Sequence, residues 1–118
     1  MKLDGVDEHQ PDPVKNDRPC VQDLVIADVR SSVAHNIAPE VIADIEARKA
    51  IGLERYGTLL QPFNGRDAVM DAYQEVLDLC MYLRQAIEEG ATALHRAYGL
   101  ALRACEELRY TLKFRGPR

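Results

Sequence analysis

The sequence predicts an all-α protein: a small helix bundle with an antiparallel helical hairpin, completed by homo-oligomerisation. Three observations support this. Apolar residues recur at steps of three and four along several segments, which is typical of amphipathic helices. Apolar residues form 47% of the 118 residues and charged residues 29%, an ordinary globular composition. Two neighbouring segments carry matching apolar seams and are joined by a short link, which favours a hairpin.

Residues 1–20 are expected to form a flexible tail, and residues 21–118 the helical domain. Pro11, Pro13 and Pro19 stand among polar residues in this first stretch, and no apolar period is present. Such a segment buries too little apolar surface to offset the entropy of ordering. The domain that remains is stable with little margin at this size, so self-association would help it.

The first two helices are predicted over residues 21–35 and 40–55. The apolar residues of the first recur at helical spacing, at Val21, Leu24, Val25, Val29 and Val33. Pro39 suits the first turn of the second helix, where its missing N–H has no partner in any case. This helix is expected to bury Val41, Ile42, Ile45 and Leu53.

Residues 56–66 form the one long connection inside the predicted core. Asn64-Gly65 is strong turn chemistry, and Asp67 is well placed to cap the helix that follows. Long connections in compact domains are often functional.

Two further helices follow, one over residues 67–89 and one that begins after Thr92 as its N-cap. Gly90 gives the first of them a stop. The two apolar seams run through Val69, Tyr73, Val76, Cys80, Leu83 and Ile87, and through Leu94, Tyr98, Ala101, Cys105, Leu108 and Leu112. Matching heptad seams across a short link predict an antiparallel hairpin.

Charge, hydropathy and cysteine spacing argue against several classes of protein. The net charge is −4 and the basic residues are scattered, which makes nucleic acid a poor partner. No stretch approaches the ~20 apolar residues of a membrane span, and residues 1–5 lack the apolar core of a signal peptide. The three cysteines lack CxxC spacing and are interpreted as buried thiols in a reducing compartment. We therefore expect a cytoplasmic protein.

Four acidic residues, Asp67, Asp71, Glu75 and Asp78, lie along one stripe of the third predicted helix, opposite its apolar seam. Like charges at this spacing repel each other, and Mg²⁺ would relieve the repulsion by binding carboxylate oxygens. Glu75 and Asp78 form an E-x-x-D pair suited to one ion. The alternative interpretation is a solvated acidic face, which is common on helices.

Lys49 stands near the apolar arc of the second helix, where a lysine needs a partner or must reach solvent. Glu46 lies one turn earlier and is close enough to pair with it. A structural ion pair and a contact to a phosphate both fit this position.

Cations also stand around the loop that follows. Arg48, Arg55 and Arg66 flank it, together with Asn64 and Gly65. Guanidinium groups beside a turn bind phosphate oxygens in bidentate fashion, and the ring of Tyr56 would stack on a base. Ordinary soluble surface for the arginines, and packing for Tyr56, are the alternatives.

Residues 45–89 resemble small phage-encoded proteins akin to the MazG-like nucleotide pyrophosphohydrolases. The segments that carry the resemblance are Glu46-Ala47-Arg48-Lys49, Gly52-Leu53-Glu54-Arg55-Tyr56-Gly57-Thr58, Asn64-Gly65-Arg66-Asp67, Asp71-Ala72-Tyr73-Gln74-Glu75-Val76-Leu77-Asp78 and Tyr82-Leu83-Arg84. That superfamily comprises all-α, usually oligomeric, Mg²⁺-dependent enzymes that cleave nucleoside triphosphates to monophosphate and pyrophosphate. Glu75 and Asp78 match its E-x-x-D element, whereas residues 40–46 lack the spacing of its E-E-x-x-E element.

The resemblance implies a set of site residues. Mg²⁺ would be held by Glu75 and Asp78 with help from Asp71 and Glu46, and Lys49 would join the two E-x-x-D acids as a catalytic residue. The substrate would be bound by Arg48, Lys49, Tyr56, Asn64 and Arg66. The expected function is a nucleoside triphosphate pyrophosphohydrolase. Two alternatives stay open: a helical oligomer that binds a nucleotide or nucleotide-derived signal without cleaving it, and a structural or protein-interaction module.

Overall fold

The structure, a computed structural model, describes residues 3–116 and confirms the all-α prediction. Four α-helices and one short 3-10 helix, η1, account for the regular structure, and residues 3–116 contain no strand. The elements are α1 (Val21–Ser32), α2 (Ala38–Tyr56), α3 (Ala68–Glu88), η1 (Thr92–Leu94) and α4 (His95–Phe114).

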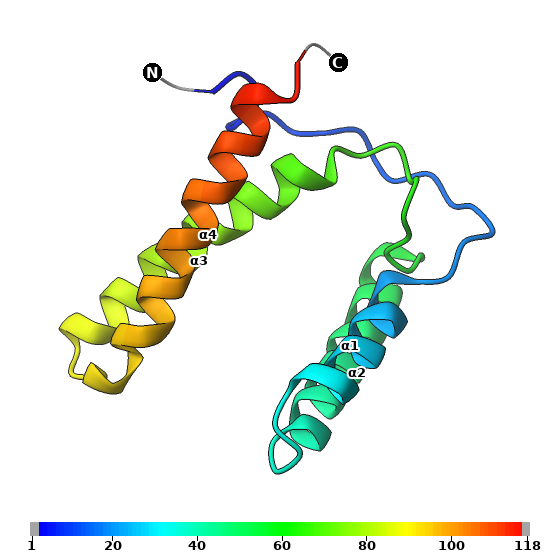
Figure 1. Cartoon of the computed structure of the whole chain (residues 1–118). Helices are drawn as coiled ribbons and strands as arrows, with labels where there is room; N and C mark the ends of the chain where they lie inside the picture. Colours follow the sequence, from blue (N-terminus) through cyan, green and yellow to red (C-terminus); the bar gives the residue numbers. More distant parts are fainter. Residues whose placement is uncertain (1–2, 117–118) are drawn as a thin grey trace. The chain divides into compact units, whose positions relative to one another are not determined.

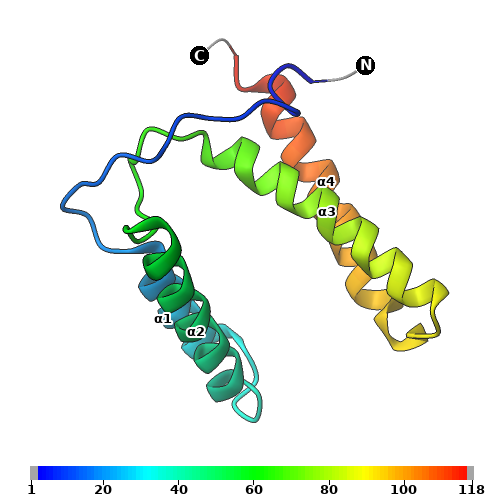
Figure 2. The same cartoon turned by 180° about the vertical axis from the view of Figure 1, so that it is seen from behind.

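The chain divides into two compact units, each built around one pair of helices. Residues 11–66 form the unit that contains α1 and α2, which lie side by side in both views (Figures 1 and 2). Residues 3–10 join residues 67–116 in the unit that contains α3 and α4, which also lie side by side. This division differs from the boundary between residues 20 and 21 that the sequence predicts.

Helix α1 buries only part of the apolar set that its sequence predicts. Ile26 and Val29 are buried, whereas Leu24 and Val25 are 48% and 41% exposed. The inward register places Gln22 one turn before Ile26, on the side of α1 that faces α2. The apolar residues of this helix lie on more than one face, so their spacing alone does not fix which face packs against α2. In the structure, the polar residue Gln22 lies at the start of the face that does.

Helix α2 begins and ends close to its predicted bounds. Pro39 lies in the first turn as expected. The helix ends at Gly57, whose φ of 72° is left-handed and whose N–H donates to the carbonyl oxygen of Leu53 at 2.8 Å. Glycine takes this conformation without the penalty of a Cβ. The prediction that Leu53 is buried is wrong, because its side chain is 47% exposed.

In the second unit, α3 is capped at both ends as the sequence indicates. The side chain of Asp67 accepts a hydrogen bond from the backbone N–H of Met70 at 3.2 Å, and Gly90 ends the helix with a φ of 109°. The interface between α3 and α4 contains Val76, Cys80, Ile87, Ala101 and Leu112, all buried. Cys80 and Cys105 meet there with their sulfur atoms 3.3 Å apart.

Residues 11–20 lie against the loop 57–66 and are held by hydrogen bonds. The backbone N–H of Asn16 donates to Gln61 Oε1 at 3.0 Å, and Gln61 Nε2 donates to the carbonyl of Asn16 at 2.8 Å. Asn16 Nδ2 also donates to the carbonyl oxygens of Pro62 and Phe63. Cys20 is buried just before α1. The sequence analysis did not anticipate these contacts.

Residues 3–10 make similar contacts in the unit of α3 and α4. Gln10 Nε2 donates to Asp71 Oδ1 at 2.8 Å, and Gln74 Nε2 donates to the carbonyl oxygen of Val6 at 2.7 Å. Within the described residues, no helix has the length and apolar character that crossing a membrane requires.

Candidate functional site

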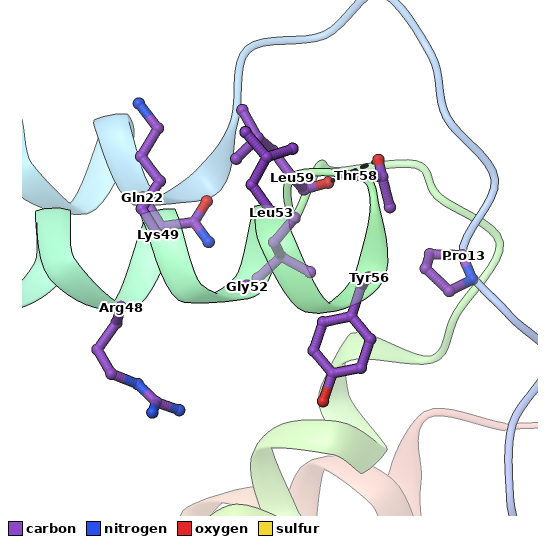
Figure 3. A pocket seen from close by; sticks show the side chains of 10 residues that line it. Pro13, Gln22, Arg48, Lys49, Gly52, Leu53, Tyr56, Thr58 and Leu59 are labelled. Carbon is purple, nitrogen blue, oxygen red and sulfur yellow. Dashed lines mark hydrogen bonds between the residues drawn. The ribbon is translucent and has the colours of Figure 1, made fainter.

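A hollow of about 320 Å³ lies beside the C-terminal half of α2, within the unit of α1 and α2 (Figure 3). Its polar wall comes from both helices and its apolar wall from the loop 57–66 and Pro13. The lining residues are Pro13, Gln22, Arg48, Lys49, Gly52, Leu53, Tyr56, Thr58, Leu59 and Leu60. Three of the five residues predicted to bind substrate, Arg48, Lys49 and Tyr56, are therefore brought together.

Lys49 is half-buried and held in place by an acidic partner on α1. Its side chain is 25% exposed, and Nζ lies 3.0 Å from Asp23 Oδ1. The hydrogen bond to Asp23 raises the pKa of Lys49, and the bond from Lys49 lowers the pKa of Asp23. The sequence suggested Glu46 as the partner of Lys49, whereas in the structure the partner is Asp23. At neutral pH the hollow therefore has a charged ammonium on its wall.

Tyr56 stands at the end of α2 with its ring largely in solvent. It is 71% exposed, and it points away from the helix beside the hollow (Figure 3). Because Gly57 ends the helix immediately after it, no further turn of α2 covers the ring. An exposed ring of this kind offers a stacking surface to a flat ligand. The alternative interpretation, that Tyr56 packs in the core of this unit, does not agree with its exposure.

Gly52 and Gln22 shape the interior of the hollow. A Cβ added to Gly52 would meet no described atom within 4 Å, so the glycine leaves this side open. Gln22 Oε1 is buried, and it has no hydrogen-bond partner among residues 3–116. A buried polar atom without a partner is costly, and a ligand that supplies a donor would offset the cost. The sequence does not point to Gln22, because the apolar positions of α1 do not fix which polar residue lies beside α2.

Asn64 and Arg66 are not among the residues that line this hollow, and their described contacts lie within the loop and between the loop and residues 11–14. Asn64 is buried, its Oδ1 accepts from the backbone N–H of Arg66 at 3.1 Å, and its carbonyl oxygen accepts from Val14. Arg66 Nη1 donates to the carbonyl oxygen of Pro11 at 2.9 Å. In this structure the side chain of Arg66 and the backbone carbonyl of Asn64 hold the loop against residues 11–14.

The acidic stripe lies on α3, in the other unit. Glu75 and Asp78 are exposed on the face opposite the buried positions Val76 and Cys80, as predicted. Asp71 is partly buried and accepts a hydrogen bond from Gln10. Asp67 caps the helix, as predicted. It also pairs with Arg115, with oxygen-to-nitrogen distances of 2.7 and 3.0 Å, a contact that the sequence does not predict.

The four predicted metal ligands are distributed over both units. Glu46 is exposed on α2, whereas Asp71, Glu75 and Asp78 belong to α3. Across residues 3–116, no three His, Cys, Asp or Glu side chains gather in a group that would hold a metal ion. Two carboxylates one helical turn apart fit a Mg²⁺ ion that takes its other ligands from water and phosphate.

Comparison of the chain with protein-family models, with curated proteins and with solved structures finds no match. The functional assignment therefore depends on the chemistry of the hollow and of the acidic stripe.

Proposed function

We propose that the chain binds a nucleoside phosphate in the hollow beside α2. The observation that supports this proposal is that Arg48, Lys49 and Tyr56 line one hollow, whose wall also contains Leu53, Leu59 and Leu60. Two cations beside an exposed ring match the two parts of a nucleotide, its anionic phosphate and its flat base.

The cationic side of the hollow suits a phosphate group. Lys49 already makes a charge-assisted hydrogen bond to a carboxylate oxygen, and a phosphate oxygen is an equivalent acceptor. Arg48, the preceding residue of α2, also lines the hollow, and its side chain extends from the other side of the helix than that of Lys49 (Figure 3), so its planar guanidinium would contact a different part of the ligand. A bound phosphate would share Lys49 with Asp23 or displace that carboxylate.

The size of the hollow limits the ligand. At about 320 Å³ it lies near the lower end of the range for small-molecule sites. It therefore suits a single nucleoside with its nearest phosphate, with the base against Tyr56 and the apolar wall of Leu53, Leu59 and Leu60. The donors of a base or sugar would satisfy Gln22 Oε1.

Gly52 offers a direct test of this assignment. Gly52→Leu should fill the hollow and abolish binding of a nucleoside triphosphate, measured by calorimetry. Gly52→Ala is the matched control, since it adds only a methyl group and raises helix propensity by about 1 kcal/mol. Both variants should be at least as stable as the wild type, because each replaces a glycine inside α2 with a better helix former. Equal binding by Gly52→Leu and Gly52→Ala would place the ligand elsewhere and refute the proposal.

Cleavage of the bound nucleotide is a second candidate function, and the exposed E-x-x-D pair Glu75 and Asp78 favours it. These two residues would hold Mg²⁺, which supplies charge neutralisation and water activation when bound. Asp71, which lies one turn earlier on the same helix, would assist them. The resemblance to the MazG-like enzymes stays a prediction.

Cleavage and binding are distinguished by one substitution on α3. If the chain is an enzyme, wild type with Mg²⁺ releases pyrophosphate from a nucleoside triphosphate, and Glu75→Gln abolishes the release without changing the melting temperature. Glu89→Gln, which changes another glutamate of the same segment, is the control. A wild type that binds nucleotide and releases no pyrophosphate would leave binding as the whole function.

We also propose that the chain self-associates, with the two helix pairs serving as antiparallel hairpins in the assembly. This proposal is supported by large apolar side chains that are exposed on α3 and α4. Among them are Leu79, Met81 and Leu100, which are 46%, 65% and 62% exposed. Light scattering coupled to gel filtration measures the mass of the assembly and tests this proposal.

If the protein is cytoplasmic, as we propose, cytoplasmic nucleotides would be the available ligands. Nucleic acid is not an expected partner.

A further inference from the structure

A second hollow, of about 270 Å³, adjoins the first on the same unit. The two share three wall residues, Leu53, Thr58 and Leu59. The remaining wall of the second hollow comes from residues 15–23 and from Gly57 and Gln61. The two hollows are therefore neighbours, and we call them the first and second compartments.

An ion pair connects the two compartments. Lys49 lines the first hollow and Asp23 lines the second, and their side chains are hydrogen-bonded to each other at 3.0 Å. A ligand that extends from one compartment into the other therefore passes a fixed ammonium group.

The second compartment carries two cations of its own, Lys15 and Arg18. The lining of this compartment includes one acidic residue, Asp23, and its carboxylate is already paired with Lys49. The balance of charge in the compartment thus favours an anion.

Both cations come from a segment whose backbone is fixed. Gln61 Nε2 donates to the carbonyl oxygens of Asn16 and Arg18 at 2.8 and 2.7 Å, and Asn16 Oδ1 accepts from the backbone N–H of Arg18 at 2.8 Å. The guanidinium carbon of Arg18 lies 4.6 Å from the ring centroid of Phe63, which holds that side chain as well. Held in this way, the segment loses less conformational entropy when a ligand binds than a flexible tail would.

We propose that the second compartment binds the terminal phosphates of a nucleoside polyphosphate, with Lys15 and Arg18 as its anion-binding residues. This inference rests on the proposed function, because the nucleoside and first phosphate occupy the first compartment. Lys49, which joins the two compartments, contacts the phosphate chain where it passes between them. The ligand class is accordingly a nucleoside di- or triphosphate, and affinity rises with each added phosphate.

The test compares mono-, di- and triphosphates of one nucleoside, and inorganic tripolyphosphate, by calorimetry on the full chain. Lys15→Ala should weaken triphosphate binding about fivefold and leave monophosphate binding unchanged. Lys49→Ala should weaken all four ligands. Arg30→Ala, which removes a cation of α1 that lines neither hollow, is the control for net charge. Lys15→Glu should enlarge the effect of Lys15→Ala without any loss of secondary structure by circular dichroism.

Each outcome has a distinct meaning. Equal loss of mono- and triphosphate binding in Lys15→Ala, or no loss in either, overturns the second compartment and leaves nucleotide binding in place. Tripolyphosphate that binds wild type and depends on Lys15, without any binding of the nucleoside monophosphate, supports anion binding in the second compartment and refutes nucleotide binding in the first. If no phosphate compound binds wild type, both proposals fail.

Discussion

The ammonium of Lys49 on α2 is hydrogen-bonded to the carboxylate of Asp23 on α1, with Nζ 3.0 Å from Oδ1. This pair fixes a cation between the two adjoining hollows, and it also gives the cation an internal competitor for any phosphate. Asp23 is therefore expected to limit affinity for the ligand.

Replacement of Asp23 with asparagine should tighten binding of a nucleoside triphosphate about threefold to tenfold, because Lys49 loses its counter-ion. Calorimetry at low salt measures the change. Asp28→Asn, which removes another exposed acid of α1, should have a much smaller effect. Weaker binding by Asp23→Asn would mean that the carboxylate takes part in holding the ligand.

The same pair predicts a pH window for stability. The hydrogen bond from Lys49 lowers the pKa of Asp23, so the stabilisation is present above the usual value of 3.8 and is lost as the pH falls through the lowered pKa. The bond to Asp23 raises the pKa of Lys49, so the stabilisation is lost as the pH rises through a value above 10.5. The stability difference between wild type and Asp23→Asn should therefore be constant from about pH 5 to pH 9.

Asn16→Ala should release residues 11–20 from the loop 57–66. The variant loses the hydrogen bonds from Nδ2 to Pro62 and Phe63 and the bond from the N–H of Arg18 to Oδ1. We expect a stability loss of about 1–2 kcal/mol in urea unfolding. Limited proteolysis should cut the variant within residues 11–20 faster than it cuts the wild type.

Asp12→Ala serves as the control for Asn16→Ala, because it changes an exposed polar residue of the same segment. A variant Asn16→Ala that resists protease as well as the wild type does would show that the side-chain bonds are not what holds the segment.

Asp67→Ala should destabilise the unit of α3 and α4 by about 1–2 kcal/mol. The substitution removes both the cap on Met70 N and the two-point pair with Arg115. Helix stability is followed by circular dichroism during urea unfolding.

Two companion variants separate the roles of Asp67. Asp67→Asn keeps an oxygen that caps the helix and loses the charge, whereas Arg115→Ala keeps the cap and loses the pair. Both should cost less than Asp67→Ala. An Arg115→Ala variant as unstable as Asp67→Ala would show that the cap on Met70 N contributes nothing to stability.

Cys105 should react slowly with alkylating reagents in the folded protein. Burial, with a smaller contribution from the hydrogen bond to Cys80, raises its pKa to about 11 from 9.0. At pH 8 its thiolate fraction is then about a hundredfold below that of an ordinary cysteine. Mass spectrometry of iodoacetamide-treated protein, native and in urea, measures the difference.

The raised pKa of Cys105 also gives a sign for alkaline stability. The folded state holds this proton more tightly than the unfolded state, so the contribution is fully present below pH 9.0 and is lost as the pH rises through about 11. Cys105→Ala should show less loss of stability over this alkaline range than the wild type. Identical alkaline unfolding curves would exclude Cys105 as a source.

The sequence predicts the helices well because their signals are local. Asp67 and Gly90 bound α3, and Pro39 lies in the first turn of α2, for reasons that involve only neighbouring residues. The inward face of α1 was predicted only in part: Val29 is buried as expected, whereas Ile26 is buried in place of Leu24 and Val25, because apolar residues stand on several faces of this helix at once. Tertiary packing against α2 selects Ile26 and Val29.

The candidate site was predicted in part. Arg48, Lys49 and Tyr56 were identified from their charge and position, and they do line one hollow. Asp23, Gln22, Lys15 and Arg18 were missed because their roles depend on contacts between segments far apart in the sequence. One feature of the sequence indicates that such a partner exists: Lys49 lies near the apolar arc of α2, where a lysine needs an acidic partner. Asp23, in the first turn of α1, is that partner.

The reciprocal hydrogen bonds between Asn16 and Gln61 join residues that are 45 positions apart. The helices themselves form from neighbouring residues, whereas this closure must wait until the intervening α1 and α2 have folded back on one another. During refolding, helical circular dichroism should accordingly recover before protection of residues 11–20 against hydrogen exchange. The order of these events makes the second compartment one of the last parts of the molecule to mature.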